Sequence, residues 1–399
     1  MTATRHEQLA ALGAVPGRAT RALVDLDVIA GNVRSLMTAI GPETGICAVV
    51  KADGYGHGAA MVARTALAAG AGRLAVATVG EAVMLRGKGI DAPLIVLGPI
   101  DASELPQAAE VECEITVAGA DLLHAARRLG ESIGRQIPVH LKIDTGMHRY
   151  GCAPDEAGAL AAMATGSGVR LVGVTTHFAC ADDPNSDLTE RQTEAFAGAF
   201  NKIRETIGLT PEVHVANSAG GLLGFGQGTA FVRFGIAMYG LAPSREVPLP
   251  AGVQPALHLV SRLARVHGVD AGAGVSYGQT YRTTAAERLG LVPIGYADGY
   301  RRQLSNLAWM GVGGKSAPVR GRVCMDQTVI GDLESGVQIG QAVGILGDLA
   351  NGPSIETMAD WLQTISYEVV TSISPRVPRY YWAGGTIVAG LVDGILNEY

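Results

Sequence analysis

Residues 48–58 read AVVKADGYGHG, a short apolar run that ends at a lysine and opens into a glycine-rich turn. The apolar stretch Ile46–Val50 predicts a buried parallel strand, because such strands are apolar on both faces. A lysine is costly in a core, so we expect Lys51 at the mouth of the strand. There its amine could form a Schiff base with an aldehyde, and partial burial would lower its pKa from about 10.4. The alternative, open on these residues alone, is a surface lysine after an edge strand.

Short apolar strands alternate with Ala-rich helical stretches from about residue 46 to residue 240. Eight strands are predicted, at Ile46–Lys51, Leu74–Thr78, Leu94–Leu97, Ile115–Val117, Val139–Ile143, Leu171–Thr176, Val213–Ala216 and Phe231–Ile236. The clearest predicted helices are Ala59–Ala69, Leu122–Leu129, Glu156–Ala164 and Glu190–Thr206. Eight βα repeats are typical of a TIM (β/α)8 barrel, which we place at residues 21–250.

The pattern changes after Pro250, where strands follow one another with no helix between them. They are predicted at Leu257–Val266, Leu289–Ile294, Val319–Cys324, Thr328–Ile330 and Ala342–Leu346, with one late helix at Ile355–Leu362. We therefore expect an α/β chain with a mainly β domain over residues 251–399, joined to the barrel near residues 248–252. Residues 1–20 form an N-terminal segment that we expect to pair with this second domain.

The composition excludes several classes of protein. The chain has 399 residues, 48% of them hydrophobic, and a net charge of −6 without a basic stripe, so nucleic acid is not an expected partner. No apolar run approaches the roughly 20 residues of a membrane span, and the start lacks the apolar core of a signal peptide, so a cytoplasmic location is expected. The five cysteines are scattered without a CxxC pair, so neither a disulfide framework nor a metal site is expected.

Barrel enzymes carry their active sites at the C-terminal ends of the strands. Polar residues collect there, namely Lys51, Tyr55, Lys142, Asp144, Arg149, His177, His214, Asn217, Ser218 and Arg233. Each residue alone says little, and a lone His177 is more often a hydrogen-bonded structural histidine than a catalyst. Their joint placement with a lysine indicates an active site.

The segment 48–58 closely resembles the cofactor-lysine segment of alanine racemases, which use pyridoxal phosphate (PLP). Further motifs of that family follow in order: LKIDTGMHR (141–149), THFA (176–179), ANSA (216–219), VRFGI (232–236), VSYG (275–278), GYADGY (295–300), VCMDQ (323–327) and SYE (366–368). The resemblance covers nearly the whole chain. It implies a homodimer in which each active site combines the barrel of one subunit with the β domain of the other.

The resemblance also implies how PLP is held. Lys51 would bind the cofactor covalently through its amine. The implied phosphate contacts are Tyr55, Asn217, Ser218, Gly235, Ile236 and Tyr367. Arg233 would face the pyridine nitrogen, and because an arginine can only donate, the ring would be a weak electron sink that suits removal and return of one proton. Simple barrel packing of Gly235 and a structural salt bridge of Arg233 are the alternatives.

Racemisation exchanges a proton on both faces of the substrate Cα, so two bases are expected. The resemblance assigns the face of the D antipode to Lys51 and the opposite face to Tyr277 from the partner subunit. The pKa of a free tyrosine is about 10. In the family a histidine matching His177 links this tyrosine to the positions of Arg233 and His214, and cationic neighbours would lower the tyrosine pKa. On the residues alone, Tyr277 is only an aromatic side chain in a glycine-flanked turn.

Substrate contacts are implied at four further positions. Arg149 offers a fork that matches a carboxylate, and the Met325–Asp326 backbone of the partner subunit is the second contact. Tyr296, also from the partner, would narrow the entrance so that a methyl side chain fits. Lys142 matches a lysine that is carbamylated in many relatives, where it braces the arginine.

The sequence thus predicts an alanine racemase that interconverts L- and D-alanine and supplies D-alanine for peptidoglycan. Four alternatives stay open: a broader amino-acid racemase of the same fold, a barrel PLP decarboxylase, a PLP-binding protein without turnover, and a barrel metabolic enzyme that does not use PLP. A decarboxylase would want an acidic partner for the ring where this chain has Arg233. Two departures from the family pattern, Phe234 in place of proline and Tyr150 in place of leucine, leave cofactor tightness and pocket shape open.

Overall fold

The computed structural model of the chain describes residues 5–399, which form two compact units. One unit comprises Ile29–Gly54 and Ala59–Gln254. The other comprises the residues up to Val28, the short stretch Tyr55–Gly58 and Pro255–Tyr399. The domain limits 1–20, 21–250 and 251–399 stay predictions, and residues 1–4 of the first lie outside the described part.

The first unit is built on eight parallel strands. These are β2 (Gly45–Val49), β3 (Arg73–Val76), β4 (Leu94–Val96), β5 (Glu114–Val117), β6 (Ile137–Lys142), β7 (Val169–Thr175), β8 (Glu212–His214) and β9 (Phe231–Phe234). Their order is β8-β7-β6-β5-β4-β3-β2-β9, and the Ala230 and Arg233 N–H groups donate to the Val213 and Ala216 carbonyls at 2.8 and 3.1 Å. The barrel is therefore nearly closed, and the predicted (β/α)8 fold is confirmed.

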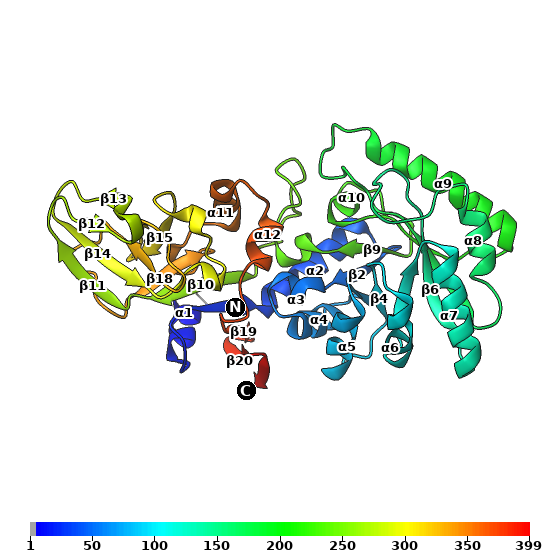
Figure 1. Cartoon of the computed structure of the whole chain (residues 1–399), viewed down its shortest axis with the longest axis horizontal. Coiled ribbons are helices and arrows are strands. Elements are labelled where there is room, and N and C mark those ends of the chain that lie inside the picture. Colours follow the sequence, from blue (N-terminus) through cyan, green and yellow to red (C-terminus); the bar gives the residue numbers. More distant parts are fainter. Residues whose placement is uncertain (1–4) are drawn as a thin grey trace. The chain divides into compact units, whose positions relative to one another are not determined.

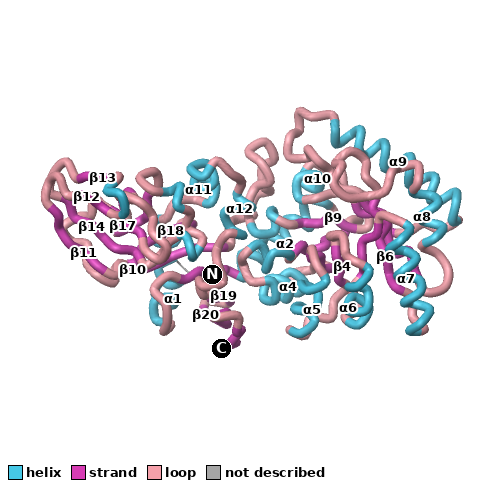
Figure 2. Tube along the Cα trace, viewed as in Figure 1, coloured by secondary structure: helices cyan, strands magenta, loops and turns pink. Residues whose placement is uncertain are grey.

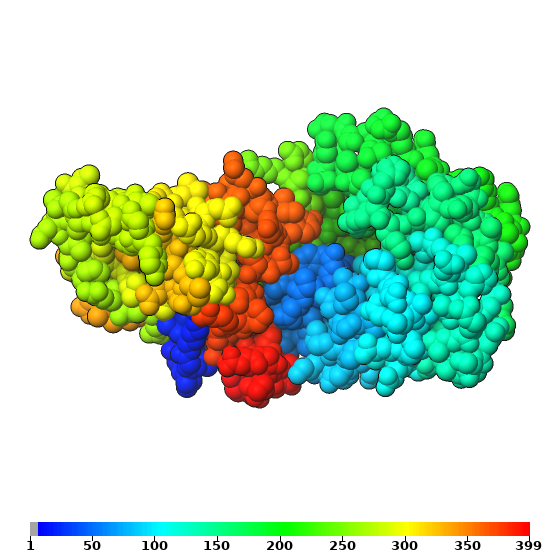
Figure 3. Space-filling model, viewed as in Figure 1, coloured from blue at the N-terminus to red at the C-terminus, as the bar shows by residue number. Residues whose placement is uncertain are grey.

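Helices surround these strands. They are α2 (Leu26–Ile40), α4 (Ala59–Ala68), α5 (Val79–Gly87), α6 (Leu105–Glu110), α7 (Ala120–Ile133), α8 (Ala157–Met163), α9 (Leu188–Ile207) and α10 (Ser218–Leu222). Figures 1 and 2 show α7, α8 and α9 lying side by side outside β6. In the space-filling view the residues from α4 to α7, coloured blue to cyan, form much of the outer surface of this unit (Figure 3). This cover explains why the strands are apolar on both faces.

The second unit is mainly β. Its largest sheet has the order β16-β15-β18-β10-β1-β19-β20-β21, and the smaller sheets are β11-β14-β17 and β12-β13. The strands are β1 (Arg21–Asp25), β10 (Leu257–Arg262), β11 (Arg265–Val269), β12 (Gly274–Val275), β13 (Tyr281–Arg282), β14 (Glu287–Val292), β15 (Trp309–Val312), β16 (Lys315–Pro318), β17 (Thr328–Ile330), β18 (Ala342–Leu346), β19 (Arg379–Ala383), β20 (Thr386–Val392) and β21 (Ile395–Glu398).

The N-terminal strand β1 lies inside this largest sheet, antiparallel to β10 and parallel to β19. The helix α1 (Arg5–Ala14) precedes it and packs on the same core. That core contains Leu12, Leu23, Val260, Leu349, Tyr380 and Trp382. Residues from both ends of the sequence therefore complete one hydrophobic core.

The structure corrects two strand predictions in this unit. The predicted strand Leu257–Val266 is two strands, since β10 ends at Arg262 and β11 belongs to another sheet. The predicted strand Val319–Cys324 is a loop. Its Gly321 has a φ of +76°, and a Cβ there would lie 2.4 Å from the Val275 carbonyl oxygen, so the chain turns where a strand would have to stay extended.

The helical predictions for this unit were partly right. The helix α11 spans Ile355–Leu362, as predicted. A second helix, α12 (Ser366–Thr371), follows it and carries Tyr367. It was not predicted, because its Val-Val-Thr run favours a strand.

Candidate active site

Lys51 lies directly after β2, at the C-terminal end of the barrel strands, as predicted. It begins α3 (Lys51–Tyr55), a turn whose backbone is left-handed at residues 52–54. The side chain is half-buried. Burial lowers the pKa of its amine, Arg149 lowers it further, and Glu81 acts in the opposite direction. A larger share of the amine is therefore neutral, and hence nucleophilic, than in an exposed lysine.

Arg233 is the hub of the strand ends. It lies on β9, is 4% exposed, and donates to partners within residues 5–399 through its two terminal nitrogens. Nη1 donates to His214 Nδ1 at 2.8 Å, and Nη2 donates to His177 Nδ1 at 3.3 Å. The structure thus brings together three predicted site residues. Burial lowers the pKa of the Arg233 guanidinium to about 10.

A chain of hydrogen bonds continues from Arg233 through the barrel interior. His214 Nε2 lies 3.0 Å from His140 Nδ1, and His140 Nε2 lies 2.8 Å from the Glu114 carboxylate, which also accepts from Arg73. Because Arg233 can only donate, His214 must accept at Nδ1 and donate from Nε2. The same reasoning makes His140 accept at Nδ1 and donate to Glu114. The ring proton of each of these two histidines is therefore assigned to Nε2.

Lys142 and Arg149 lie at the end of β6 and in the loop after it. Asp144 shapes this loop, because its Oδ1 accepts from the N–H groups of Gly146, Met147 and His148 at 3.0 to 3.1 Å. Burial lowers the pKa of the Lys142 amine to about 8, with Arg233 adding to the shift. Lys142 is 9% exposed, whereas Arg149 is exposed and available to a ligand.

The strand ends therefore gather positive charge. Burial, then Arg233 and three further cations, hold the pKa of His177 well below its usual value, and the three are Lys142, Arg149 and Lys51. Burial and Arg233 do the same to the pKa of His214. Both histidines stay neutral, because a protonated ring would place another positive charge beside these cations. Such a concentration of cations suits a ligand with several negative charges.

The four predicted phosphate contacts of the barrel also lie together. Asn217 Oδ1 accepts from the Gly220 N–H at 3.0 Å and thereby caps α10. Ser218 Oγ accepts from the Gly235 N–H at 3.0 Å, and Ile236 follows in the chain. The hydroxyl of Ser218 thus joins the start of α10 to the end of β9.

The remaining predicted residues lie in the second unit. The exposed side chains Tyr277, Tyr296 and Met325 come from three turns that are joined by hydrogen bonds. Ser276 Oγ donates to the Arg322 carbonyl at 2.6 Å, and the N–H of Tyr296 donates to the Cys324 carbonyl at 3.0 Å. Tyr277 and Tyr296 are 72% and 42% exposed, so both aromatic rings are open to contact from outside this unit.

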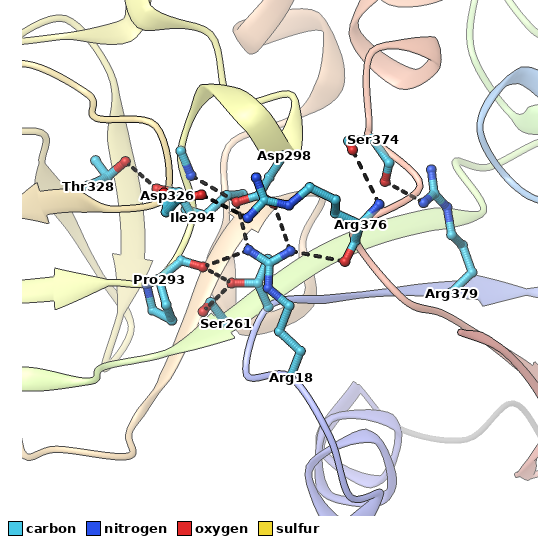
Figure 4. Close-up of polar contacts among 12 residues, drawn as sticks. Arg18, Ser261, Pro293, Ile294, Asp298, Asp326, Thr328, Ser374, Arg376 and Arg379 are labelled. Atoms are coloured by element: carbon cyan, nitrogen blue, oxygen red, sulfur yellow. Dashed lines mark hydrogen bonds and ion pairs between the residues drawn. The ribbon is translucent and has the colours of Figure 1, made fainter. Parts of the chain in front are cut away.

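Asp298 ties two of these turns together, as Figure 4 shows. Its carboxylate is fully buried and accepts two hydrogen bonds from Arg18, both 2.7 Å long. Arg376 lies 3.6 Å from the same carboxylate and donates to Asp326 at 2.8 Å. Asp298 follows Tyr296 in one turn and Asp326 follows Met325 in the other, so the cluster braces the backbone that presents both exposed side chains.

Tyr55 and Tyr367 approach each other within the second unit, with ring centroids 6.2 Å apart. A Cβ at Gly56, where φ is +79°, would lie 2.2 Å from the Val370 carbonyl oxygen, so the stretch 55–58 packs closely on α12. Burial raises the pKa of the Tyr55 hydroxyl, and Tyr367 adds to the shift. Tyr55 therefore stays protonated and can donate to an anion.

The structure shows what surrounds the two residues that depart from the family pattern. Phe234 is fully buried on β9, where a Cβ at Gly221 would lie 3.3 Å from its ring. The Tyr150 hydroxyl donates to the Thr116 carbonyl at 2.9 Å, and burial raises its pKa to about 12. Tyr150 thus anchors the loop next to Arg149 to β5.

Residues that the sequence did not single out complete the site. They are Glu81, His140 and Glu114 in the barrel, and Arg18, Asp298 and Arg376 in the second unit. Among residues 5–399 no group of three or more His, Cys, Asp or Glu side chains is placed to hold a metal ion. Over the same range, none of the helices has the length and apolar character needed to span a membrane.

Two family models cover most of the chain. "Alanine racemase, N-terminal domain" matches residues 24–243, and "Alanine racemase, C-terminal domain" matches residues 256–381. The alanine racemase of Geobacillus stearothermophilus is 43% identical over 370 residues, which are 92% of this chain and 94% of the relative. That of Desulforamulus reducens is 41% identical over 365 residues, 90% of this chain and 97% of the relative.

Solved structures agree with these relatives. The alanine racemase of Bacillus anthracis with bound L-Ala-P superposes with a TM-score of 0.89 at 38% identity, covering 97% of this chain and 99% of that one. The alanine racemase of the D-cycloserine producer Streptomyces lavendulae gives a TM-score of 0.87 at 38% identity, covering 93% of this chain and 98% of that one. The chain therefore belongs to the alanine racemase family of isomerases, and its activity is the racemisation of alanine.

Proposed function

We propose that this chain racemises alanine with PLP bound to Lys51, using Lys51 and Tyr277 as the two bases. The observation that carries the proposal is the cationic strand end, where Lys51, Lys142, Arg149 and Arg233 all act on His177 and Arg149 helps burial to lower the pKa of Lys51. PLP combines an aldehyde with a phosphate dianion, and the substrate adds a carboxylate. A neutral amine among fixed cations matches all three groups.

The donors of the barrel fit the cofactor. Both terminal nitrogens of Arg233 are occupied by protein acceptors, and within residues 5–399 its Nε–H has none, so this N–H is the donor left for the pyridine nitrogen. Asn217, Ser218, Gly235, Ile236, Tyr55 and Tyr367 would hold the phosphate. Bound PLP supplies an aldehyde that couples to amines and a ring that accepts charge from the substrate Cα.

The residues of the chain then divide the work. Arg149 binds the substrate carboxylate, and Lys142, once carbamylated as in many relatives, would brace Arg149. Lys51 removes or returns the Cα proton on one face, and the partner subunit's Tyr277 acts on the other. Because Arg233 only donates, the pyridine nitrogen stays unprotonated, which limits side reactions. Tyr296 and the Met325–Asp326 backbone, also from the partner, close the pocket around a methyl group.

This scheme needs a homodimer with shared active sites. The exposure of Tyr277, Tyr296 and Met325 supports it, because large exposed hydrophobic groups gathered on one surface are typical of an interface. A broader amino-acid racemase is the second candidate, with the same residues at work. We further propose that the product serves peptidoglycan synthesis in the cytoplasm, for which cell fractionation and D-alanine dependence of a deletion strain are the tests.

Proton NMR of L-alanine in D2O tests the proposal. With purified protein and PLP, we expect the Cα signal to disappear while D-alanine grows toward an equal mixture, as separated by chiral chromatography. Lys51→Ala should abolish both, and borohydride should fix PLP onto Lys51 in the unmodified chain. Serine and lysine as substrates measure breadth. Racemisation that persists without PLP, or PLP fixed at another lysine, would contradict the proposal.

A further inference from the structure

The backbone that follows Lys51 has a positive φ at every residue from Ala52 to Gly56, and its first three residues have left-handed φ and ψ angles. The φ and ψ angles are 52° and 50° at Ala52, 51° and 49° at Asp53, and 62° and 44° at Gly54. Glycine adopts this conformation readily, but an alanine has no side-chain hydrogen bond to offset its cost. Consecutive residues of this kind persist only where their surroundings hold them, and they concentrate at functional sites.

Glu81 on α5 supplies such a hold. One carboxylate oxygen accepts from the Ala52 N–H at 2.6 Å, and the other accepts from the N–H groups of Ala77 and Thr78 at 2.7 and 3.2 Å. In an ordinary capping box the glutamate turns back only to the N-cap residue, which here is Thr78. The second oxygen of Glu81 instead reaches the turn after Lys51, so one side chain joins the ends of β2 and β3.

Two further hydrogen bonds of the turn are local. Asp53 Oδ1 accepts from the Ala59 N–H at 2.9 Å, and the Gly54 N–H donates to the Val50 carbonyl at 2.9 Å. Both bonds remain within the segment that contains Lys51. Glu81 ties this segment to a different strand and helix, and it does so with an ionised acceptor, whose hydrogen bonds are about twice as strong as neutral ones.

Glu81 also acts on Lys51 through its charge. Among charged groups, Arg149 and Glu81 act on the Lys51 amine, and Lys51 in turn acts on His177. Arg149 favours the neutral amine, whereas the carboxylate favours the ammonium. Glu81 therefore has two effects of opposite sign on the reactivity of Lys51 near neutral pH. Its hydrogen bond holds the lysine in place, and its charge reduces the neutral fraction.

We propose that Glu81 is a positioning residue, which clamps the left-handed turn and thereby orients Lys51 for covalent coupling to the cofactor aldehyde. This inference rests on the proposed function, since it takes Lys51 as the cofactor lysine. In that coupling the Nζ lone pair attacks the aldehyde carbon and the aldehyde oxygen leaves as water, so one C=N bond replaces the C=O bond. The clamp affects where Nζ lies when it attacks.

The test follows this coupling in the full-length chain freed of bound PLP. PLP alone is added between pH 6 and pH 10, the absorbance of the adduct gives the rate, and borohydride followed by peptide mass locates it on Lys51. Glu81→Gln removes the charge and one acceptor. Glu81→Asp keeps the charge but is one methylene too short to reach both sides. Thr78→Ala is the matched control, since it removes the Oγ that accepts from the Glu81 N–H at 3.3 Å but keeps the backbone N–H that donates to the Glu81 carboxylate.

We expect Glu81→Gln to lower the plateau rate at high pH by about tenfold or more, the usual loss for a hydrogen bond to a charged group. The midpoint of its pH profile should move to lower pH, because the ammonium loses its anionic neighbour. Glu81→Asp should lower the plateau with a smaller shift of the midpoint, and Thr78→Ala should keep both. A Glu81→Gln profile that coincides with that of Thr78→Ala would overturn the inference. An unmodified chain that forms no adduct at Lys51 would instead refute the proposed function, and the inference with it.

Discussion

Stability should fall as the pH falls below about 6.5, because His214 is buried as a neutral ring. Burial and Arg233 hold its folded-state pKa well below the unfolded value of about 6.5. Below that value the unfolded chain binds a proton that the folded chain does not, so each step down in pH favours unfolding. The hydrogen-bond chain gives the physical reason, since a protonated His214 would have to aim an N–H at the Arg233 guanidinium.

The size of the effect follows from linkage. One histidine that cannot be protonated in the folded state costs about 1.4 kcal/mol of stability between pH 7.5 and pH 5.5. His177, whose pKa is also depressed but whose ring is only half-buried, adds at most the same again. Two other shifted groups act outside this range: Lys142, with a pKa of about 8, titrates above it, and Glu114, whose pKa is lowered, titrates below it.

Urea unfolding at both pH values, followed by circular dichroism at a fixed PLP concentration, measures this loss. His214→Gln should be less stable than the unmodified chain at both pH values, yet its pH-dependent loss should be smaller by about 1.4 kcal/mol. His124→Gln is the matched control, because this side chain is exposed on α7 and meets water in both states. Equal pH-dependent losses in the unmodified chain and in His214→Gln would refute the reasoning.

Three further predictions concern the shared site and its support. Tyr277→Phe should abolish racemisation while PLP binding survives, and NMR should show faster Cα exchange of D-alanine than of L-alanine; retained racemisation would remove Tyr277 from its role. Lys51→Ala mixed with Tyr277→Phe should recover activity, because one site of the mixed dimer holds both bases; no recovery despite demonstrated subunit exchange would count against a shared site. Asp298→Asn should lower the free energy of unfolding, measured in urea, by about 3 kcal/mol, which is at the lower end for a broken buried ion pair because Arg18 is partly exposed. Asp332→Asn removes an exposed carboxylate and should cost under about 1 kcal/mol. Equal costs would contradict the buried-pair argument.

The barrel could be predicted because its signals are local. Each strand is a short apolar run, and a polar residue marks the start of the turn after it. Lys51, directly after Val50, is an example. The predicted strand Val319–Cys324 failed because its fate depends on a distant contact, the approach of the Val275 carbonyl to Gly321. The helix α12 was missed because tertiary packing overrides the strand preference of its valines.

The site residues also fall into two groups, those with a local signal in the sequence and those that depend on contacts between distant residues. Residues at strand ends, such as Lys51 and Arg233, could be found from the fold alone. Glu114 and His140 lie at the start and in the middle of their strands, so position along the strand gave no reason to choose them. Glu81 resembles an ordinary helix cap in the sequence, and only the structure shows that its second oxygen reaches Ala52. Pairings across many residues follow from the fold, not from spacing.

The hydrogen bonds that link Arg233 through His214 and His140 to Glu114 all run in one direction. This series of side chains therefore does not conduct protons. A proton could pass along two imidazoles only if each ring accepted at one nitrogen and released at the other, and the first donor is an arginine, which does not give up its proton. Protons taken from the substrate therefore have no route to the floor of the barrel. In the proposed scheme these protons return through the base that took them or leave through solvent at the open end, and the buried histidines do not carry them away from the substrate.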